Sequence, residues 1–452
     1  MPSDWGIVHL YRRAGFGIDL PTAQAKTAQS LASVVDELLD DVVDVTRPSF
    51  LDDDIGDWEK EYGLRAWWYD RMATAAKPLQ EKMTLFWHGH FCSENAKVAD
   101  MRLMWDQNNL FRTNCMGNFR QLVHDMSLQP AMLIYLDNAP NDKEAPNENF
   151  ARELMELFTV GVNQYTQADI IAAARAWTGH NLDYDVDPHE YIFRPERHDY
   201  GNKTFMGQVR AWDGPEIIDF LLQESTTKKT TAAKFMARKL WTFFAYPSPA
   251  QNIVDDLAQI LLTTDWNVKE TLRALFVRPE FYSTTCRRGL VRPPVDWIVA
   301  ILKATGLPMT EPPGDLPHFN LWGSEEMGQE LFEPPNVAGW KNNAYWLGTT
   351  QYWARASWIW HYLWMLHEAG FLQVEVMDVL DNTGLGDARY ATAVDNALRA
   401  FGIYWPSDNT RYRLTHWIKR QYEAPPADGE WDHFAWIFLT QLVVLSPEFM
   451  LA

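Results

Sequence analysis

The spacing of apolar residues constrains the fold of this 452-residue chain more than any other feature. Apolar side chains recur every three to four residues through most of the sequence, which is the period of a helix with one buried face. Runs that alternate apolar and polar residues, as half-buried strands require, are scarce. The predicted helices cover residues 24–40, 65–76, 78–87, 101–126, 129–136, 148–160, 166–177, 214–223, 230–244, 249–263, 267–276, 291–304, 350–369, 390–400 and 431–445. The sequence therefore predicts an all-α, mainly α-helical protein.

Three stretches between these helices carry aromatic and polar residues in place of low-complexity sequence: 181–213, 305–349 and 402–430. Each is too long for a simple connection, so we expect ordered loops, with at most a small hairpin around residues 190–206. With 47% hydrophobic residues, the chain has enough apolar surface for a large core. We predict a single large helical domain over residues 1–452, with subdivision at the first two loops left open.

The negative charge of the chain argues against polyanionic partners. A net charge of -20 argues against nucleic acid and against an anionic membrane surface, because phosphate binding needs a concentrated basic surface. The first residues contain no basic patch followed by an apolar segment, which predicts a cytoplasmic protein and leaves a mature secreted form open. The most apolar stretch, residues 434–445, is shorter than the roughly 20 residues that a membrane span needs. We expect no membrane partner, and the oligomeric state stays open.

Cysteine usage indicates no metal or disulfide framework. The three cysteines, Cys92, Cys115 and Cys286, lie far apart and form no paired ligand spacing. We expect free, buried thiols.

Residues 144–161 place charge at the start of an otherwise apolar helix. Pro146 suits a first helical turn, and Gly161 ends the run. Asn149, Glu153 and Glu156 are spaced by four and three residues, so they share one face of the helix. A carboxylate stripe on a buried helix is what a metal site or an acid–base pair requires.

The same helix also has a purely structural interpretation. Glu148 can stabilise the helix dipole, and Arg152 can form a solvated ion pair with Glu148 or Glu156 across one turn.

Further motifs occur in a fixed order around this helix, and together they resemble the bacterial family catalogued as domain of unknown function 1800. The motifs are residues 9–17, 86–91, 135–138, 144–161, 165–169, 174–179, 198–203, 332–340 and 446–449. The resemblance covers nearly the whole chain and implies no particular reaction. One departure is His180, because members of the family tend to carry Trp after the Thr178-Gly179 pair.

His88 and His90 form a second candidate site. If Gly89 ends the preceding helix, the following residue becomes extended and both imidazoles converge on one metal ion. Glu153 would complete the ligand set around one divalent metal ion. The alternative is a pair of hydrogen-bonded histidines inside an all-α core.

The third candidate is His198-Asp199, in a loop that also carries Lys203. Asp beside His can orient the imidazole ring or complete a metal shell. The alternative is a turn around Gly201, since Asp199 and Asn202 are good turn formers.

The fourth candidate is the segment 333–346. Pro334 and Pro335 stiffen it, and Asn336 and Trp340 are of the kind that bind sugars by hydrogen bonds and stacking. The alternative is a rigid lid that plugs the helical body. Serine hydrolase, phosphate-loop and dinucleotide motifs are missing from the sequence.

We predict a hydrolase with a His/carboxylate site that acts on a small-molecule or glycan substrate, a carbohydrate or another polyol. The predicted catalytic residues are Glu153, Glu156, Asp199 and His198; the predicted substrate-binding residues are Asn149, Arg152, Trp177, Lys203, Asn336 and Trp340; the predicted metal ligands are His88, His90 and Glu153. We expect His88, His90, Glu153 and His198 to approach one cavity.

Two versions of the chemistry stay open. In one, a metal ion activates water; in the other, carboxyl groups divide acid and base roles at a glycosidic bond, with Asp137 or Asp199 as the partner of a helix carboxylate. The alternative to an enzyme is a non-enzymatic helical scaffold or binding protein in which the polar groups fix helix packing.

Overall fold

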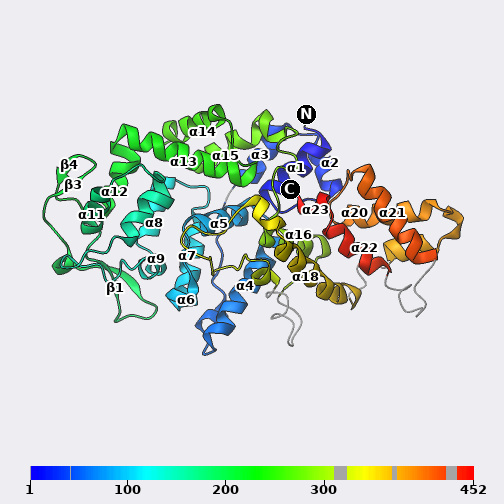
Figure 1. Cartoon of the computed structure of the whole chain (residues 1–452), viewed down its shortest axis with the longest axis horizontal. Helices are drawn as coiled ribbons and strands as arrows, with labels where there is room; N and C mark the ends of the chain where they lie inside the picture. The colour runs from blue at the N-terminus through cyan, green and yellow to red at the C-terminus, as the bar shows by residue number, and fades with distance from the viewer. Residues whose placement is uncertain (1, 41, 310–322, 369–373, 424–434) are drawn as a thin grey trace.

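The computed structural model describes residues 2–40, 42–309, 323–368, 374–423 and 435–452. Within these residues helices carry most of the fold, and the strands form two antiparallel two-stranded sheets. The molecule is elongated, with the hairpins at one end and α20 (Ala388–Ala400), α21 (Asp408–Glu423) and α22 (Ala435–Val444) at the other (Figure 1). The predicted all-α class is confirmed, with two hairpins where at most one was expected.

The N-terminal third forms nine helices within its described residues: α1 (Asp4–Ala14), α2 (Leu20–Lys26), α3 (Leu31–Leu39), α4 (Asp57–Thr74), α5 (Pro78–His90), α6 (Asn95–Val98), α7 (Met101–Thr113), α8 (Phe119–Ser127) and α9 (Pro130–Tyr135). The helix predicted at 24–40 is split, because the Ser30 side chain accepts a hydrogen bond from the Ser33 N–H and starts α3. The helix predicted at 101–126 is split before α8, where Asn118 accepts from the Gln121 N–H. Helix α1 is absent from the predicted set.

The middle of the chain contains α10 (Asn149–Glu153), α11 (Gln167–Ala176), α12 (Gly214–Asp219), α13 (Thr226–Phe244), α14 (Gln251–Thr263), α15 (Val268–Val277) and α16 (Pro294–Thr305). Wider π-helical turns follow α10, at Leu154–Thr159, and α12, at Phe220–Glu224. The two hairpins pair β1 (His180–Asp183) with β2 (Glu190–Phe193) and β3 (Lys203–Phe205) with β4 (Gln208–Arg210). They account for much of the predicted loop 181–213.

The C-terminal part adds α18 (Thr349–Glu368), α19 (Val379–Asp381) and α23 (Pro447–Met450) to the three helices at the end of the molecule. Short helical turns lie at Ser49–Asp52, Pro195–Arg197, Pro279–Tyr282, Asn343–Leu347, Val374–Asp378 and Thr383–Leu385. The prediction of a loop over 402–430 is wrong where α21 forms, because Leu414 and Ile418, four residues apart, are buried on one face of a helix.

Parts of four predicted segments lie outside the described residues. They are portions of the loops 305–349 and 402–430 and of the helices 350–369 and 431–445.

One contiguous cluster of buried apolar residues runs from Ile7 to Met450. Eight tryptophans among the described residues are fully buried, so packing accounts for many of the indole rings: Trp68, Trp87, Trp177, Trp212, Trp241, Trp297, Trp346 and Trp436. The three cysteines are free and buried, as predicted. The single-domain organisation stays a prediction.

The two ends of the chain meet near the middle of the molecule (Figure 1). The Arg12 guanidinium on α1 donates to the carbonyl oxygens of Glu448, at 2.7 Å, and Leu451, at 3.2 Å. The Arg292 N–H, just before α16, donates to the Met450 carbonyl at 2.9 Å. Helices α1, α16 and α23 therefore share one packed region.

Candidate functional site

Two of the sequence motifs pack against each other. The Phe332 N–H donates to Nε2 of His88 at 3.1 Å. Gly339 has a φ of +76°, and a Cβ there would lie 2.6 Å from the Gly89 carbonyl oxygen and 3.0 Å from Cys92 Sγ. A position with that backbone conformation and that approach requires glycine. Residues 332–340, the motif loop, are thus fixed against the end of α5.

The structure contradicts the expected break at Gly89. Helix α5 continues through Gly89 to His90, so the two imidazoles, two residues apart, point in different directions. The His88 ring lies against Trp68, Phe332 and Trp340. The predicted convergence of His88 and His90 on one metal ion is wrong, because packing against two different parts of the core keeps this turn helical.

His90 has both of its ring nitrogens in use. Lys239 Nζ lies 2.8 Å from Nδ1 and donates to it, so Nε2 carries the proton and donates to the Phe158 carbonyl at 3.1 Å. Burial lowers the pKa of His90 well below its usual value and lowers the pKa of Lys239 to about 8. His90 therefore connects α5, α13 and the π turn as a neutral core residue.

His88 is also neutral, since burial lowers its pKa to about 3. Its Nε2 accepts the hydrogen bond from Phe332, so Nδ1 carries the proton. The role that the structure gives this histidine is to hold the motif loop.

Five glutamates near the motif loop form what we call the carboxyl cluster: Glu61, Glu94, Glu325, Glu330 and Glu333. Arg65 on α4 is the buried cation among them, with 3% of its side chain exposed. It pairs with Glu61, with Glu325 at 2.9 Å and with Glu330 at 2.5 Å. One guanidinium balances one of these charges, so the cluster carries an excess of negative charge when its carboxyl groups are ionised.

Asn95 joins α4 to the motif loop. Its backbone N–H donates to the Phe332 carbonyl at 2.9 Å, and its side-chain Nδ2 donates to Glu61 Oε2 at 3.0 Å. Asn95 is 8% exposed, and its Oδ1 atom is buried without a hydrogen-bond partner among the described residues. An unpaired amide oxygen beside a carboxylate is unusual in a closed core.

Glu333 follows a strained residue. Phe332 has a φ of +66°, a conformation that bulky side chains rarely adopt and that is concentrated at functional sites. Burial, followed by the negative charge of Glu61, raises the pKa of the Glu333 carboxyl to about 7. The pKa of Glu333 is therefore shifted toward neutral pH.

Tyr135 connects the carboxyl cluster to the predicted carboxylate helix. It is 8% exposed, and burial together with the charges of Glu94, Glu153 and Glu333 raises the pKa of its hydroxyl. Burial and the neighbouring Glu156 also raise the pKa of Glu153. The charges of Glu153 and Glu333 thus act on the same tyrosine hydroxyl.

The other predicted residues of this helix have individual partners. Glu156 accepts a hydrogen bond from the Tyr165 hydroxyl, and Asn149 Nδ2 donates to Asp137 at 3.0 Å. The chain changes from α to π geometry after Glu153, a feature that often marks functional sites. The π turn is not visible in the apolar spacing of the sequence.

Arg152 pairs with Glu148 at 2.8 Å across one helical turn, which is one of the two ion pairs expected from the sequence. Asn336 is exposed on the motif loop, and its side chain accepts from the Ala338 N–H at 2.9 Å. Trp340 is half-buried beside His88, with ring centroids 5.3 Å apart. Asn336 and Trp340 therefore lie on the loop that carries Glu333.

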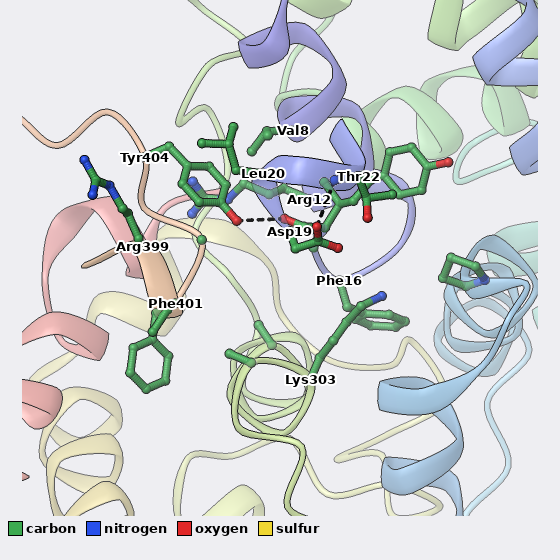
Figure 2. A pocket seen from close by; sticks show the side chains of 18 of the residues that line it. Val8, Arg12, Phe16, Asp19, Leu20, Thr22, Lys303, Arg399, Phe401 and Tyr404 are labelled. Atoms are coloured by element: carbon green, nitrogen blue, oxygen red, sulfur yellow. Dashed lines mark hydrogen bonds between the residues drawn. The ribbon is translucent and has the colours of Figure 1, made fainter. Parts of the chain in front are cut away.

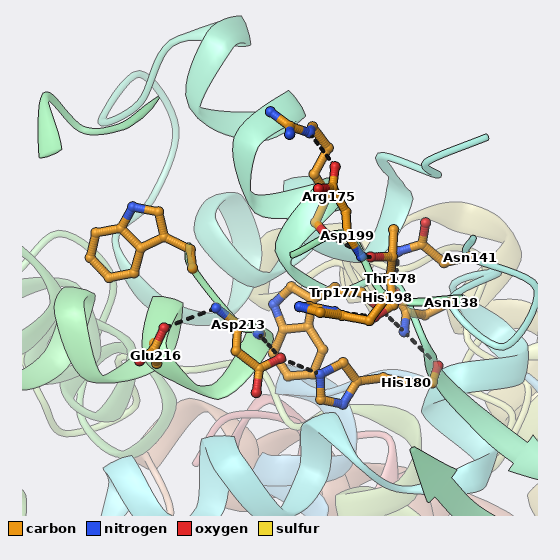
Figure 3. A network of polar contacts seen from close by, with 12 residues as sticks. Asn138, Asn141, Arg175, Trp177, Thr178, His180, His198, Asp199, Asp213 and Glu216 are labelled. Carbon is orange, nitrogen blue, oxygen red and sulfur yellow. Dashed lines mark hydrogen bonds and ion pairs between the residues drawn. The ribbon is translucent and has the colours of Figure 1, made fainter. Parts of the chain in front are cut away.

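His198 and Asp199 belong to a separate polar network (Figure 3). His198 is 4% exposed and its Nδ1 lies 2.8 Å from the Thr178 carbonyl. Burial opposes ionisation of Asp199, but hydrogen bonds from Arg175, at 2.7 Å, and from the Gly201 N–H outweigh it and hold its pKa below the usual value. These contacts match the alternative of a structured turn.

Two predicted substrate-binding residues are buried in this network. Trp177 is 1% exposed and packs against Phe150 and His180. Lys203 is 1% exposed, and its ammonium group donates to the carbonyls of Asp199 and Trp212. Neither side chain is free to contact a substrate in this arrangement, because each is enclosed by its packing or hydrogen-bond partners.

His180 is bonded at both ring nitrogens. Nε2 lies 3.0 Å from Asp213, and Nδ1 lies 3.0 Å from the Tyr191 hydroxyl. Figure 3 shows Asp213 reaching His180 from the loop before α12. His180, which stands where members of the family tend to carry Trp, thus links β1 to the start of α12.

The structure connects Glu153 with Glu94 and Glu333 only through their charge effects on Tyr135, and it gives each histidine a different set of neighbours. His88 contacts the motif loop, His90 contacts Lys239, and His198 contacts Thr178. The expectation that these residues share one cavity with Glu153 is wrong, because each imidazole is enclosed by a different set of neighbours. Within the described residues, no group of three or more His, Cys, Asp or Glu side chains has the geometry of a metal site.

Most of the carboxyl cluster was not predicted from the sequence. Two signals were present: Glu333 stands in the motif 332–340, and Tyr135 begins the motif 135–138. Glu61 and Arg65 are four residues apart, but an isolated pair of this kind usually marks a solvated helix face.

None of the helices in the described ranges combines the length and the hydropathy needed to cross a lipid bilayer.

The fold and the site define an elongated α-helical protein in which a strained motif loop carries a carboxyl group with a raised pKa. The chain belongs to the family described as "Protein of unknown function (DUF1800)", which it matches over residues 9–451. Neither a curated protein nor a solved structure matches the chain.

Proposed function

We propose that this protein is a hydrolase whose carboxyl cluster performs acid–base chemistry, with Glu333 as the general acid and Glu153 as the general base. The observation that carries the proposal is the position of Glu333, which follows the strained Phe332 and lies among the carboxyl groups of the cluster, where burial and these charges raise its pKa to about 7. A general acid works best when its pKa lies near the operating pH.

The surroundings of Glu333 favour this role over simple packing. The positive φ of Phe332 and the unpaired Oδ1 of Asn95 both lie at the attachment of the motif loop. Strain and unsatisfied buried polar groups are retained where a function needs them. The charges of Glu153 and Glu333 both act on the Tyr135 hydroxyl, and we assign this hydroxyl the role of orienting a substrate hydroxyl or water.

A carbohydrate or another polyol is the substrate class that fits best. The motif loop presents Asn336 and the half-buried Trp340, and exposed aromatic side chains follow directly along the chain. Tyr345, Tyr352 and Trp353 are 42%, 44% and 73% exposed. Aromatic rings of this kind stack on sugar faces, while amides and carboxylates bind sugar hydroxyls.

The proposed chemistry needs fewer residues than the sequence predicted. His198, Asp199, Trp177 and Lys203 stay in the structural network, and His88 positions the motif loop. The chemistry therefore rests on carboxyl groups, and no step depends on a metal ion held by the two histidines.

The test is a panel of glycans, esters and phosphoesters assayed with the wild-type chain and with Glu333→Gln and Glu153→Gln. We expect turnover of a glycan, and a loss of roughly a hundredfold or more in kcat for each variant, as for a missing general acid or base. Glu196→Gln, at an exposed carboxylate outside the cluster, is the matched control and should keep full activity.

The alternative is a non-enzymatic scaffold. It is favoured by the closed packing of His90 and His198, and it predicts no turnover on any member of the panel. In that case Glu333→Gln and Glu153→Gln would change only the stability of the fold.

A further inference from the structure

A cavity of about 1040 Å³ lies apart from the carboxyl cluster. Its walls come from α1 and the loop after it, the start of α5, α16 and the end of α20 (Figure 2). The residues after α4 that line it, Ala75 and Ala76, are about ten positions beyond Arg65, which is roughly 15 Å along a helix. Within the described residues, no member of the carboxyl cluster lines this cavity.

The cavity is strongly basic in a protein with a net charge of -20. The cations that line it are Arg12, Lys26, Arg292, Lys303 and Arg399, and one carboxylate, Asp19, accompanies them among the described residues. Lys303 and Asp19 are labelled on different walls in Figure 2. Asp19 is committed to capping α2, where its side chain accepts from the Thr22 N–H at 2.8 Å.

Arg292 has a buried side chain with hydrogen-bond donors that are unpaired in the described part of the chain, and this is the main observation at the cavity. Arg292 is 3% exposed, and its guanidinium stacks on the Phe449 ring at 4.5 Å, a second lining residue. Its Nε and Nη1 atoms are buried without a hydrogen-bond partner among the described residues. Burying a guanidinium group with unpaired donors costs free energy unless an anion accepts hydrogen bonds from it.

Arg12, on the neighbouring wall of the cavity, also has a buried guanidinium nitrogen without a partner in the described part of the chain. Its Nη2 donates to the carbonyls of Glu448 and Leu451, yet its Nε is buried and unpaired among the described residues. Burial, then the positive charge of Arg292, lowers the pKa of Arg12 well below its usual value. Two guanidinium groups that repel each other beside an open cavity create a site for an anion.

The protein supplies little compensating charge behind this wall. Arg13 and Arg355 are 2% and 0% exposed and add two more buried cations. Asp296, 4% exposed, is paired with Lys82 at 3.0 Å, and its single negative charge also acts on Arg12, Arg13, Arg292 and Arg355, so one carboxylate faces five cations. An anion in the cavity would therefore meet an excess of positive charge.

The remaining walls are apolar. Val8, Phe16, Leu20, Ala300 and Phe401 line the cavity, and Figure 2 shows several of these side chains beside Lys303 and Tyr404. A cavity lined by both cations and apolar side chains suits a charged head attached to an apolar body.

We propose that this cavity binds a phosphate group through Arg12 and Arg292, with Lys303 as a third cation. Guanidinium groups bind the oxygens of a phosphate with paired, charge-assisted hydrogen bonds, and the double negative charge matches the excess of cations better than a single carboxylate does. The phosphate can be free or carried on an alkyl chain, and the two sources differ in whether the apolar walls contribute.

The experiment measures binding to the whole chain by calorimetry and by the shift in melting temperature at constant ionic strength. The probes are inorganic phosphate and n-octyl phosphate, with n-octanol and octanoate as controls. We expect n-octyl phosphate to raise the melting temperature in proportion to the logarithm of its concentration. Tighter binding of n-octyl phosphate than of inorganic phosphate identifies an alkyl phosphate as the occupant, and equal binding identifies free phosphate.

Two variants test the residues. Arg292→Met and Lys303→Met should each weaken phosphate binding by roughly tenfold or more, while Arg238→Met, at an exposed arginine on α13, should leave it unchanged. Without a ligand, Arg292→Met should melt no lower than the wild-type chain, because the change removes a buried cation with unpaired donors. This last result separates a ligand-binding role from a structural one.

The proposal is overturned if neither phosphate probe binds, or if octanoate binds more tightly than n-octyl phosphate. It is also overturned if the phosphate probes bind equally to the wild-type chain, Arg292→Met and Lys303→Met. None of these results depends on hydrolase activity, because binding and melting are measured directly.

Discussion

The Phe332 N–H donates to Nε2 of His88 at 3.1 Å across 244 residues of sequence. This bond ties the motif loop to the end of α5, and the next residue is Glu333. A buried histidine thus sets the position of the carboxyl group that carries the proposed chemistry.

Replacing His88 with Ala should detach the motif loop. The change leaves the Phe332 N–H unpaired and opens a cavity beside Trp68, so we expect a loss of about 3 kcal/mol in the free energy of unfolding. Chemical denaturation measures it. His416→Ala, at an exposed histidine on α21, should cost less than about 0.5 kcal/mol, and an equal loss in both variants would contradict the role of His88.

The same histidine should make the protein sensitive to acid. Its folded-state pKa of about 3 lies below the unfolded value, so its stabilising contribution is present above pH 6.5 and is lost as the pH falls through the window between these values. His88→Gln keeps an acceptor without the titration. Between pH 7 and pH 5 the variant should lose about 2 kcal/mol less stability than the wild-type chain. Identical pH profiles would show that His88 is not the group responsible.

Glu333 should affect the pH dependence of stability in the opposite direction to His88. Its folded-state pKa of about 7 lies above the unfolded value, so the stability associated with it is present below pH 4.5 and is lost as the pH rises through 7. Glu333→Gln removes this loss. Allowing for solvent screening at a half-exposed group, the variant should gain about 1 kcal/mol relative to the wild-type chain between pH 5 and pH 8. Denaturant titrations at the two pH values measure the gain, and Glu196→Gln should show none.

The contact at Gly339 should tolerate no side chain. Gly339→Ala places a Cβ 2.6 Å from the Gly89 carbonyl at a φ of +76°, so we expect a loss of about 3 kcal/mol or more. Gly207 has a φ of +82° and no atom within 4 Å of the point that a Cβ would occupy, so Gly207→Ala should show only the backbone strain, about 1 kcal/mol. Equal losses would mean that the close approach at Gly339 contributes nothing.

The sequence predicts the helices of this fold better than the site. Helices follow from local spacing, and the errors occur where a single cap, such as Ser30 or Asn118, divides a continuous apolar pattern. Glu153 lies beside Glu156 of its own helical stretch, whereas the carboxyl cluster brings Glu61 of α4 to Glu333 of the motif loop, and such long-range proximity is not encoded in local spacing. The error at His88 and His90 has the same origin, because packing on both sides of Gly89 outweighs the local preference of glycine to end a helix.

Arg65 offers the last test of the carboxyl cluster, because it is the buried cation that balances Glu61, Glu325 and Glu330. Arg65→Met leaves these carboxylates facing one another, and breaking a buried ion pair by removing one partner costs about 3–5 kcal/mol. The loss should be greater at pH 8 than at pH 5, since burial raises the pKa of Glu330 and protonation of that carboxyl group at the lower pH relieves the repulsion. Denaturation at both pH values measures this difference. Arg413→Met, at an exposed arginine, should show no pH-dependent loss, and a loss in Arg65→Met that is the same at both pH values would mean that the guanidinium acts through packing and not through charge.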